Sequence, residues 1–400
     1  MISFKDAYEK VLQQSLDLGD EKVLLQKSMG RVLAEEIFAD RDFPPFDRST
    51  KDGIAINYAA IEKGRISFKI EGVLPAGMPQ ETLQFLENCL EIMTGAVCPK
   101  NADTIVMYEQ VTIENGIATL LKAPKKGQNI HRKGSDEKEG TVLLKKGGRI
   151  DTAEIGVLAS MGKAEVLVKK VPKIAVISTG NELVAVSETP LPHQIRKSNT
   201  MSLEAALSKQ GVFSQQLHLS DEKNKIEEAL EKAVQENDVL ILSGGVSKGR
   251  FDFIPDAMET LGIKKIFHRV AQRPGKPFWF GVHPVQNTVI FAFPGNPIST
   301  FANYHLYFLP WLYTTWGLAV ESKTVILQEE IKIEPPLTRF IQVKTTWKQG
   351  GLCANTLSDN GSGDLTSLSR SDGFICLDPR EKSYQKGELV PFVSTKSFLP

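Results

Sequence analysis

The 400-residue sequence has few of the features that mark disulfide-rich or zinc-binding proteins. Its four cysteines (Cys89, Cys98, Cys353 and Cys376) form no Cys-x-x-Cys pair, and its six histidines form no His-x-His or His-Glu-x-x-His pattern. A disulfide framework or a zinc site is therefore not expected. A reducing cytosol is the simplest compartment for such a chain.

The sequence also lacks an excess of charge of either sign. It has 48 Lys and Arg residues against 48 Asp and Glu residues, so the formal net charge is 48 − 48 = 0. This balance gives no indication of binding to nucleic acid or to an anionic membrane. Any site for an anion must therefore be local.

No stretch has the layout of a signal peptide or a membrane span. Residues 1–11 lack a basic segment followed by an apolar one. The most apolar window, residues 304–320, contains His305, Pro310 and several hydroxyl side chains, which favours a buried helix. We expect a soluble, cytoplasmic protein that contacts neither membrane nor nucleic acid.

The length predicts two to four domains, because 400 residues exceed one ordinary core. Strand and helix patterns alternate over residues 171–318, which predicts a three-layer α/β/α domain with a mostly parallel sheet. Short alternating runs over residues 319–400 predict a C-terminal β-barrel or sandwich, with the barrel as our assignment. Residues 41–140 are β-rich and interrupt a small, elongated α+β N-terminal domain made of residues 1–40 and 141–170. The predicted fold class is multidomain α/β.

Capping signals predict three helices in the N-terminal domain. Ser3 begins a helix that reaches Leu16, and a second helix follows Ser28 with Val32, Leu33 and Ile37 on one face. A third begins at a capping box made of Asp151 and Glu154. All three are expected to be scaffold.

The inserted β-rich module carries its own polar motifs. The segment RDFPPFDRSTKDG at 41–53 breaks the helical pattern and by residue type is a linker into a new domain. The Asn-Gly pair at 115–116 predicts a β-hairpin. Thr94 lies in a Met-Thr-Gly sequence, and a basic run at 122–133 leads to Asp136. By itself the basic run is typical of a solvated face.

The segment NDVLILSGGVSKGRFDFIPD at 237–256 organises the rest of the chain. An apolar run from Val239 stops at Ser243-Gly244-Gly245, which predicts a buried strand followed by a glycine turn and a loop into a helix. Glycines let backbone N–H groups approach an anion closely. The pattern matches neither a P-loop nor a dinucleotide fingerprint. On its own it is equally well explained as a tight turn.

Two Pro-Gly loops strengthen the prediction of an anion site. The segment AQRPGKPFWFGV at 271–282 carries Arg273 and Lys276, and VIFAFPGNPIS at 289–299 follows it. Proline and glycine fix the shape of such loops. In open α/β sheets, ligands bind where the parallel strands end. These loops, the glycine turn and STGNE at 178–182 therefore predict a single pocket for a phosphate-like ligand.

Six motifs, taken together and in order, resemble the molybdopterin molybdenumtransferase family, to which the C-terminal part of gephyrin is related. The motifs are STKDG, IMTG, STGNEL, SGGVSKGRFDF and the two Pro-Gly loops, and the resemblance extends over essentially the whole chain. It implies an enzyme that inserts molybdate into adenylylated molybdopterin. The products would be AMP and molybdenum cofactor, with Mg²⁺ assisting by offsetting charge on the phosphoanhydride.

The resemblance also implies site residues and partners. The implied catalytic residues are Asp52, Thr94, Asp136, Glu182 and Asp252, with Glu182 and Asp252 also as metal ligands; the implied substrate-binding residues are Ser243, Gly244, Gly245, Ser247, Arg273, Lys276, Pro277, Gly295, Asn296, Pro297 and Ser299. The family is dimeric, with the inserted module of one subunit facing the ligand-binding domain of the other. A homodimer is therefore expected, with transient contact to the adenylyltransferase or to acceptor molybdoenzymes.

Three positions depart from the usual family pattern. Lys51 stands where methionine is common, Arg273 where lysine opens the Pro-Gly loop, and Lys197 where an acid often precedes Ser198. Arginine keeps the charge of lysine but replaces a compact ammonium with a planar fork, which puts the family's oxyanion geometry in question at Arg273. An acidic role at position 197 is equally in question.

Two other functions stay open. One is molybdopterin adenylylation, whose enzyme resembles residues 171–315 alone, and the other is a non-catalytic, gephyrin-like scaffold. The additional modules on both sides of that region, with Asp52 in place, count against the first. The acids at positions 52, 182 and 252 count against the second.

Overall fold

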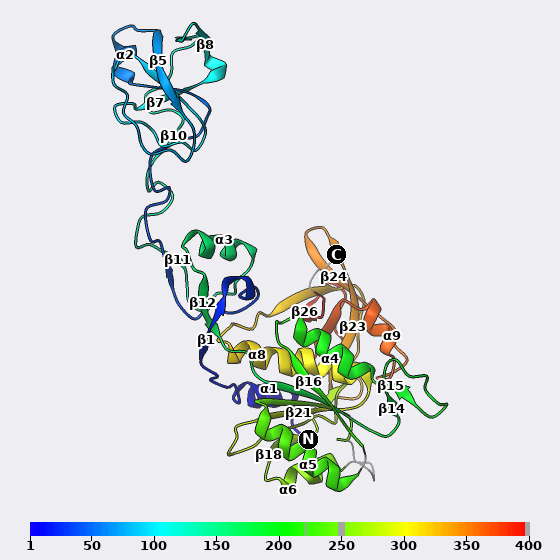
Figure 1. Cartoon of the computed structure of the whole chain (residues 1–400). Coiled ribbons are helices and arrows are strands. Elements are labelled where there is room, and N and C mark those ends of the chain that lie inside the picture. Colours follow the sequence, from blue (N-terminus) through cyan, green and yellow to red (C-terminus); the bar gives the residue numbers. More distant parts are fainter. Residues whose placement is uncertain (221, 247–252, 397–400) are drawn as a thin grey trace. The chain divides into compact units, whose positions relative to one another are not determined.

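The computed structural model of the chain describes residues 1–220, 222–246 and 253–396. The chain forms two compact units: a larger one of residues 1–23, 30–34 and 167–400, and a smaller one of residues 24–29 and 35–166. The larger unit contains a central sheet and a barrel, and the smaller unit contains the β-rich module (Figure 1). The predicted multidomain α/β fold class is confirmed. The four domain boundaries within these two units stay predictions.

The central sheet of the larger unit has six strands. Their order is β16 (Ser214–Leu219), β13 (Ile174–Thr179), β17 (Val239–Ser243), β21 (Val289–Phe293), β20 (Trp279–Val282) and β18 (Lys264–His268). The first four strands are parallel, and β20 and β18 are antiparallel to their neighbours. The prediction of a mostly parallel sheet is therefore confirmed.

Helices cover both faces of the central sheet, so its inner strands β13, β17 and β21 are buried at every position. In β13, Ile174 and Val176 face a core shared with α1 (Phe4–Leu12), α4 (Ser198–Ser208), α7 (Pro297–Asn303) and α8 (Leu309–Thr315). Ala175 and Ile177 face a second core with α5 (Lys223–Glu236) and α6 (Ile254–Thr260). A strand buried on both faces has a continuous apolar sequence rather than an alternating one.

The C-terminal segment forms a closed barrel. Its strands follow the order β23 (Thr338–Lys348), β24 (Gly351–Thr356), β22 (Lys323–Leu327), β26 (Leu389–Ser394) and β25 (Gly373–Leu377). Strand β25 pairs back onto β23, which closes the ring. A sixth short strand, β19 (Gln272–Arg273), pairs in parallel with β23 and so joins the first Pro-Gly loop to the barrel. Helix α9 (Leu365–Arg370) lies between β24 and β25 in the chain, and β14 (Leu183–Val184) pairs with β15 (Ile195–Arg196) beside the central sheet.

The smaller unit is organised around another six-stranded sheet. Its order is β7 (Thr104–Met107), β4 (Gly53–Ile56), β6 (Cys89–Ile92), β5 (Ser67–Leu74), β9 (Ile117–Leu120) and β8 (Val111–Glu114). Helices α2 (Tyr58–Glu62) and α3 (Thr152–Ser160) and the two-stranded pairs β3 (Arg48–Ser49) with β10 (Ile130–His131) and β2 (Ile37–Phe38) with β11 (Val142–Leu144) complete it. The predicted hairpin is confirmed: β8 and β9 meet at Asn115 and Gly116, with φ of 51° and 76°. Positive φ at both turn residues is what a type I′ hairpin requires.

The helix signals were only partly correct. The capping box is confirmed, because the Asp151 side chain accepts from the backbone of Glu154 and the Asp151 amide donates to the Glu154 side chain at 2.9 Å. The N-terminal helix ends at Leu12 rather than Leu16. The helix predicted after Ser28 is wrong. A short 3₁₀ turn, η1 (Leu25–Lys27), precedes Ser28. Met29 and Gly30 then form a turn, Leu33 lies in a β-bridge, and β2 begins at Ile37.

Tertiary pairing explains the missing helix. Leu33 forms an antiparallel bridge with Val168, and the Ala34 amide donates to the Leu167 carbonyl at 2.9 Å. These pairings satisfy the backbone in an extended form, and the side chains of this segment suit a strand as well as a helix. The helical spacing after Ser28 was therefore a local coincidence.

The apolar window at 304–320 forms part of the larger unit's core, as predicted. It begins with a π-helix, η3 (Tyr304–Phe308), and continues into α8. Within the described ranges, the structure has no helix with the length and apolar character needed to cross a membrane.

Candidate functional site

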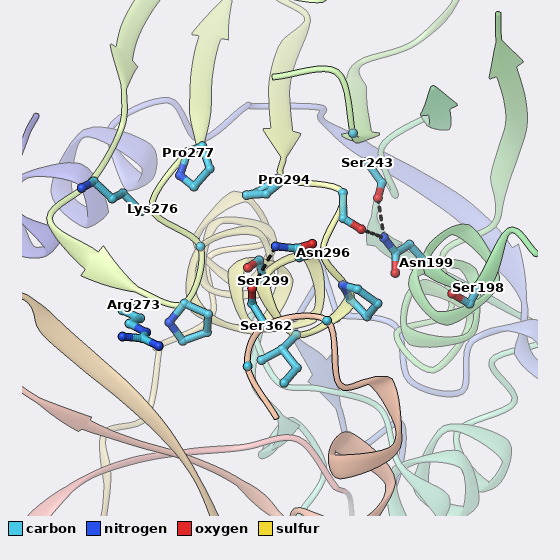
Figure 2. A pocket seen from close by; sticks show the side chains of 18 of the residues that line it. Ser198, Asn199, Ser243, Arg273, Lys276, Pro277, Pro294, Asn296, Ser299 and Ser362 are labelled. Atoms are coloured by element: carbon cyan, nitrogen blue, oxygen red, sulfur yellow. Dashed lines mark hydrogen bonds between the residues drawn. The ribbon is translucent and has the colours of Figure 1, made fainter. Parts of the chain in front are cut away.

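A cavity of about 880 Å³ lies at the carboxyl ends of β13, β17 and β21. Because these three strands are parallel, the segments that follow them meet at one edge of the sheet. The loop from Arg273 to Pro277, which precedes β20, forms a further wall (Figure 2). The volume is in the range of small-molecule sites.

Most of the residues predicted to bind substrate line this cavity. The lining includes Glu182, Ser243, Gly244, Gly245, Arg273, Lys276, Pro277, Gly295, Asn296, Pro297 and Ser299. Ser247 and Asp252 lie outside the described residues. The catalytic candidates Asp52, Thr94 and Asp136 belong to the smaller unit. The roles of all these residues stay predictions.

Asn199 connects three segments at the floor of the cavity. Its Nδ2 donates to Ser243 Oγ at 2.9 Å and to the Gly295 carbonyl at 2.7 Å (Figure 2). The first turn of α4, the end of β17 and the loop after β21 are therefore fixed relative to one another.

The glycine turn after β17 is required by both conformation and space. Gly244 and Gly245 have φ of 103° and 70°, in the region that L side chains rarely adopt. A Cβ on Gly244 would lie 2.8 Å from the Thr179 hydroxyl, and one on Gly245 would lie 2.7 Å from Ile254. Only glycine allows the chain to turn this closely beside β13, which leaves the turn's backbone facing the cavity.

The barrel supplies a wall of the cavity that sequence reasoning missed. Asn296 Nδ2 donates to Ser362 Oγ at 2.8 Å, and the Ile298 amide donates to the Ser362 carbonyl at 3.1 Å (Figure 2). Arg339 also lines the cavity and is the register partner of Arg273 in the β19–β23 pair. Two guanidinium groups are therefore held next to each other at the cavity wall.

Burial and the neighbouring positive charge of Arg273 lower the pKa of Arg339 below its usual value, while Asp359 opposes the shift. The Arg339 Nε is buried without a hydrogen-bond partner among the described residues. A guanidinium that is partly desolvated and beside a like charge is stabilised by an anion.

The cavity has a local excess of positive charge even though the whole chain is neutral. Its basic lining residues are Arg196, Lys197, Arg273, Lys276 and Arg339, and its acidic ones are Glu182 and Asp359. Among the described lining residues, five basic against two acidic side chains leave a local formal charge of +3. Lys197, which departs from the family pattern, adds to this excess. The site suits an anionic ligand.

In the smaller unit, Asp52 and Thr94 contact each other. The Thr94 amide and hydroxyl both donate to Asp52 Oδ1, at 2.6 and 2.8 Å. These two hydrogen bonds lower the pKa of Asp52. Asp52 is therefore an exposed, ionised carboxylate with a fixed orientation. Asp136 contacts His131, whose Nε2 lies 2.8 Å from Asp136 Oδ1.

The family resemblance implies Mg²⁺, which is held through oxygen ligands such as carboxylates. No group of three or more His, Cys, Asp or Glu side chains that could hold a metal is found among the described residues. Glu182 nevertheless lines the basic cavity. Mg²⁺ is usually held by one or two carboxylates together with substrate phosphates and waters rather than by a full protein cage. The donor set therefore fits a Mg²⁺ ion held jointly with a phosphate-bearing substrate.

The missed residues gave no local signal. Arg339 lies in RFIQVKTTW, which is an ordinary strand pattern, and Ser362 lies in a turn-rich segment at 359–363. Strand pairing between β19 and β23 brings Arg339 to the cavity, and hydrogen bonds from Asn296 and Ile298 hold Ser362 there. Asn199 could have been considered, because a polar residue at the start of a helix near a sheet edge is a frequent ligand contact.

Comparison with known proteins agrees with this geometry. Residues 2–162 match the model described as "MoeA N-terminal region (domain I and II)", residues 175–314 match "Probable molybdopterin binding domain", and residues 324–394 match "MoeA C-terminal region (domain IV)". The cavity lies between strands and loops of the second and third matched regions.

Full-length relatives and a solved structure extend the match to the whole chain. A molybdopterin molybdenumtransferase of Synechocystis sp. is 38% identical, with 98% of this chain and 99% of the relative covered. One from Staphylococcus epidermidis is 31% identical, with 99% and 96% covered. The crystal structure of a molybdopterin biosynthesis MoeA protein from Pyrococcus horikoshii is 30% identical, with a TM-score of 0.82 and full coverage of both chains.

The fold and the matched regions define a multidomain protein with a "Probable molybdopterin binding domain" between MoeA N- and C-terminal regions. The chain belongs to the MoeA family, the molybdopterin molybdenumtransferases.

Proposed function

We propose that the chain inserts molybdate into adenylylated molybdopterin, releasing AMP and forming molybdenum cofactor. The observation that carries this proposal is the basic cavity, formed by the glycine turn, the two Pro-Gly loops and the barrel, in a chain related to molybdopterin molybdenumtransferases over its full length. The matched regions on both sides of the molybdopterin-binding region weigh against an enzyme that only adenylylates.

The proposed substrate contacts follow from charge and geometry. Arg273 and Lys276 bind the dianionic oxyanion, since both are basic side chains of a loop with fixed shape. The backbone at Gly244 and Gly245 faces the phosphate groups of the substrate, where no side chain intervenes. Ser299 contributes from α7, although its side chain is largely buried.

The proposed catalytic carboxylates lie in both units. Glu182 holds Mg²⁺ together with the substrate phosphates, and a bound Mg²⁺ offsets the charge on the phosphoanhydride that breaks. Asp52, oriented by Thr94, and Asp136 act in the same reaction from the inserted module. Asp252 and Ser247 stay in the proposal on the sequence motif alone.

A reconstitution experiment tests the proposed reaction. Purified protein is mixed with adenylylated molybdopterin, Mg²⁺ and molybdate, and AMP release and molybdenum incorporation are measured together. Coupled release and incorporation are expected. Net ATP consumption with unmodified molybdopterin would instead identify an adenylyltransferase. Substrate binding without turnover, unchanged in an Asp52→Ala variant, would identify a scaffold.

We also propose that the chain is a cytoplasmic homodimer. The cysteines are all free thiols, which is consistent with a reducing compartment. Light scattering coupled to size exclusion is expected to give twice the chain mass of 44.2 kDa. A single chain mass at micromolar concentration would overturn the dimer. Whether the adenylyltransferase or acceptor enzymes bind transiently is tested by the same measurement with the purified partner added.

A further inference from the structure

A buried polar network lies beneath the loop that carries Arg273 and Lys276. Its members are Gln272, Asn303 and Tyr307, whose side chains are fully buried. Gln272 Nε2 donates to Asn303 Oδ1 at 2.9 Å, and the Tyr307 hydroxyl donates to Gln272 Oε1. Buried polar side chains are costly unless they are paired, so a network at this depth needs an explanation beyond packing.

The network contacts the backbone of the loop at two successive carbonyls. Gln272 Nε2 also donates to the Pro274 carbonyl at 2.9 Å, and Asn303 Nδ2 approaches the Gly275 carbonyl at 3.4 Å. Gly275 has a φ of 85°, and a Cβ there would lie 2.8 Å from Gln272 Nε2. The two amide side chains therefore touch the loop closely, at the position where it turns.

Strand geometry links the network to the cavity. Gln272 and Arg273 are consecutive residues of β19, so their side chains point to opposite sides of the strand. The Gln272 side chain is fully buried. Arg273 is exposed and lines the cavity (Figure 2). On the other side of the loop, the Val270 amide donates to the Lys276 carbonyl at 2.9 Å. A shift of Gln272 would therefore move Arg273, and the loop that carries Lys276.

An unusual helix segment presents the network's other two members. Asn303 is the last residue of α7, and Tyr307 lies in the π-helix η3. Residues four apart share a face, so both side chains reach Gln272 from one surface. A π-helical turn is rare and often occurs at functional sites. Here it aligns Tyr307 with a glutamine from a distant loop.

We propose that Gln272, Asn303 and Tyr307 are positioning residues that set the affinity of the Arg273–Lys276 loop for a tetrahedral dianionic oxyanion. This inference rests on the proposed function, in which that loop binds molybdate. The network acts by holding two cationic side chains in place before the ligand arrives. Preorganisation of this kind lowers the entropic cost of binding.

The smallest test is Tyr307→Phe, which removes one hydroxyl and leaves the Gln272 oxygen without its donor. Sodium molybdate binding is measured by calorimetry, and KM and kcat are measured in the reconstituted reaction. The expected result is a rise in Kd and KM for molybdate of about tenfold, the equivalent of one buried hydrogen bond. We expect kcat at saturating molybdate to change by less than about twofold, because the reacting groups are untouched.

The chain offers a matched control in the same π-helix. The Tyr304 side chain is 1% exposed, and its hydroxyl has no hydrogen-bond partner within the described residues. Tyr304→Phe removes the same atom from the same helix without touching the network. It is expected to leave Kd, KM and kcat at wild-type values.

Two variants at Gln272 extend the test. Gln272→Glu keeps the side-chain shape and still accepts from Tyr307, but a carboxyl group has at most one donor, so at least one of the two donated hydrogen bonds is lost and a rise in KM at least as large as that of Tyr307→Phe is expected. Because Tyr307 acts through Gln272, adding Tyr307→Phe to Gln272→Leu is expected to raise KM no further. Additive increases in KM from the two changes would show that Tyr307 does not act through Gln272.

The outcomes separate this inference from the proposed function. Wild-type protein that neither binds molybdate nor releases AMP overturns the proposed function. Active wild-type protein with an unchanged KM in folded Tyr307→Phe overturns the inference alone. An equal rise in KM for Tyr304→Phe would also overturn it, since the effect would then belong to the helix. If the Gln272 variants fail to fold, Tyr307→Phe against Tyr304→Phe decides.

Discussion

At the scale of single residues, the arrangement that most needs a ligand is the pair of guanidinium groups from β19 and β23. Arg273 and Arg339 are register partners, and the positive charge of Arg273 contributes to a lowered pKa of Arg339. Like charges this close are unfavourable in the free protein. An anion bound between them would relieve the repulsion, and this relief would contribute to the free energy of anion binding.

Replacing Arg339 is therefore expected to weaken oxyanion binding. Arg339→Ala removes a charged donor, and hydrogen bonds to charged groups contribute about 1.5–3 kcal/mol, so Kd for molybdate should rise about ten- to hundredfold. Titration calorimetry with sodium molybdate measures this. Arg370→Ala, which changes an exposed arginine of α9, serves as the control and should bind normally. Unchanged or tighter molybdate binding by Arg339→Ala would show that the Arg273–Arg339 pair does not bind the oxyanion.

Asp372 gives a residue-scale prediction for the stability of the barrel. Its side chain is 1% exposed and lies 2.9 Å from Lys344 Nζ and 3.1 Å from Lys396 Nζ. Burial alone would raise its pKa, but hydrogen bonds from Thr345 and the two lysines outweigh burial and lower the pKa to about 2. The folded-state pKa is thus below the ordinary value of 3.8. The stabilisation is therefore present above about pH 4 and is lost as the pH falls toward 2.

The measurement is urea unfolding of wild type and Asp372→Asn across pH. The shift from 3.8 to about 2 corresponds to about 2 kcal/mol of stabilisation near neutral pH. Asp372→Asn should be less stable than wild type by at least this amount at pH 7, because a buried amide cannot pair with both lysines. The difference should shrink on acidification below about pH 4. A difference that stays constant down to pH 2 would mean that the carboxylate charge is not the cause.

At the scale of elements, local chemistry could be predicted from the sequence and long-range pairing could not. The capping box at Asp151 and the hairpin at Asn115 depend on residues within four positions of each other, so the sequence contains the whole signal. The segment after Ser28 fits a helix and a strand equally, and pairing with Val168 decides. For the same reason the candidate pocket's loops could be predicted from the central sheet's pattern, but Arg339 could not.

The glycine turn after β17 provides an element-scale test with a close control. Gly245 and Gly262 have φ of 70° and 69°, so alanine at either position carries the same left-handed strain of about 1 kcal/mol. A Cβ on Gly245 would meet Ile254 and the Thr179 hydroxyl, whereas one on Gly262 would meet nothing within 4 Å. The difference between the two variants therefore isolates the effect of crowding at the cavity.

We expect Gly262→Ala to lower the free energy of unfolding only by the left-handed backbone strain and to leave the substrate kinetics unchanged. Gly245→Ala should lower the free energy of unfolding by a further ~1–3 kcal/mol, the usual cost of overpacking. It should also raise KM for adenylylated molybdopterin. Thermal unfolding and steady-state kinetics on both variants check this. Equal losses of stability and equal kinetics would indicate that the turn is needed only for its backbone conformation.

At the scale of the whole molecule, the inserted module begins and ends at neighbouring points of the chain. The Ala39 amide donates to the Thr141 carbonyl at 2.9 Å, and the Gly140 amide donates to the Ala39 carbonyl at 2.9 Å. The module has its own six-stranded sheet, with separate apolar clusters around Ile54 and Ala55 on its two faces. A segment with its own core and adjacent ends can be removed without crossing the rest of the fold.

Excision of residues 41–140, with a short glycine linker from Asp40 to Thr141, is therefore expected to leave the larger unit folded. The cavity residues all lie in that unit, so the shortened protein should bind molybdate with a Kd within about threefold of wild type, a difference of less than 1 kcal/mol. Turnover should be abolished, because Asp52, Thr94 and Asp136 are gone.

Full-length Asp52→Ala is the matched control, and it should bind molybdate as well as the wild type does. Its rate of AMP release should be at least about a hundredfold below the wild-type rate, the scale of losing a general acid or base. Turnover by the shortened protein would place all catalytic groups in the larger unit. Loss of molybdate binding by a folded, shortened protein would mean that the cavity alone is not the oxyanion site.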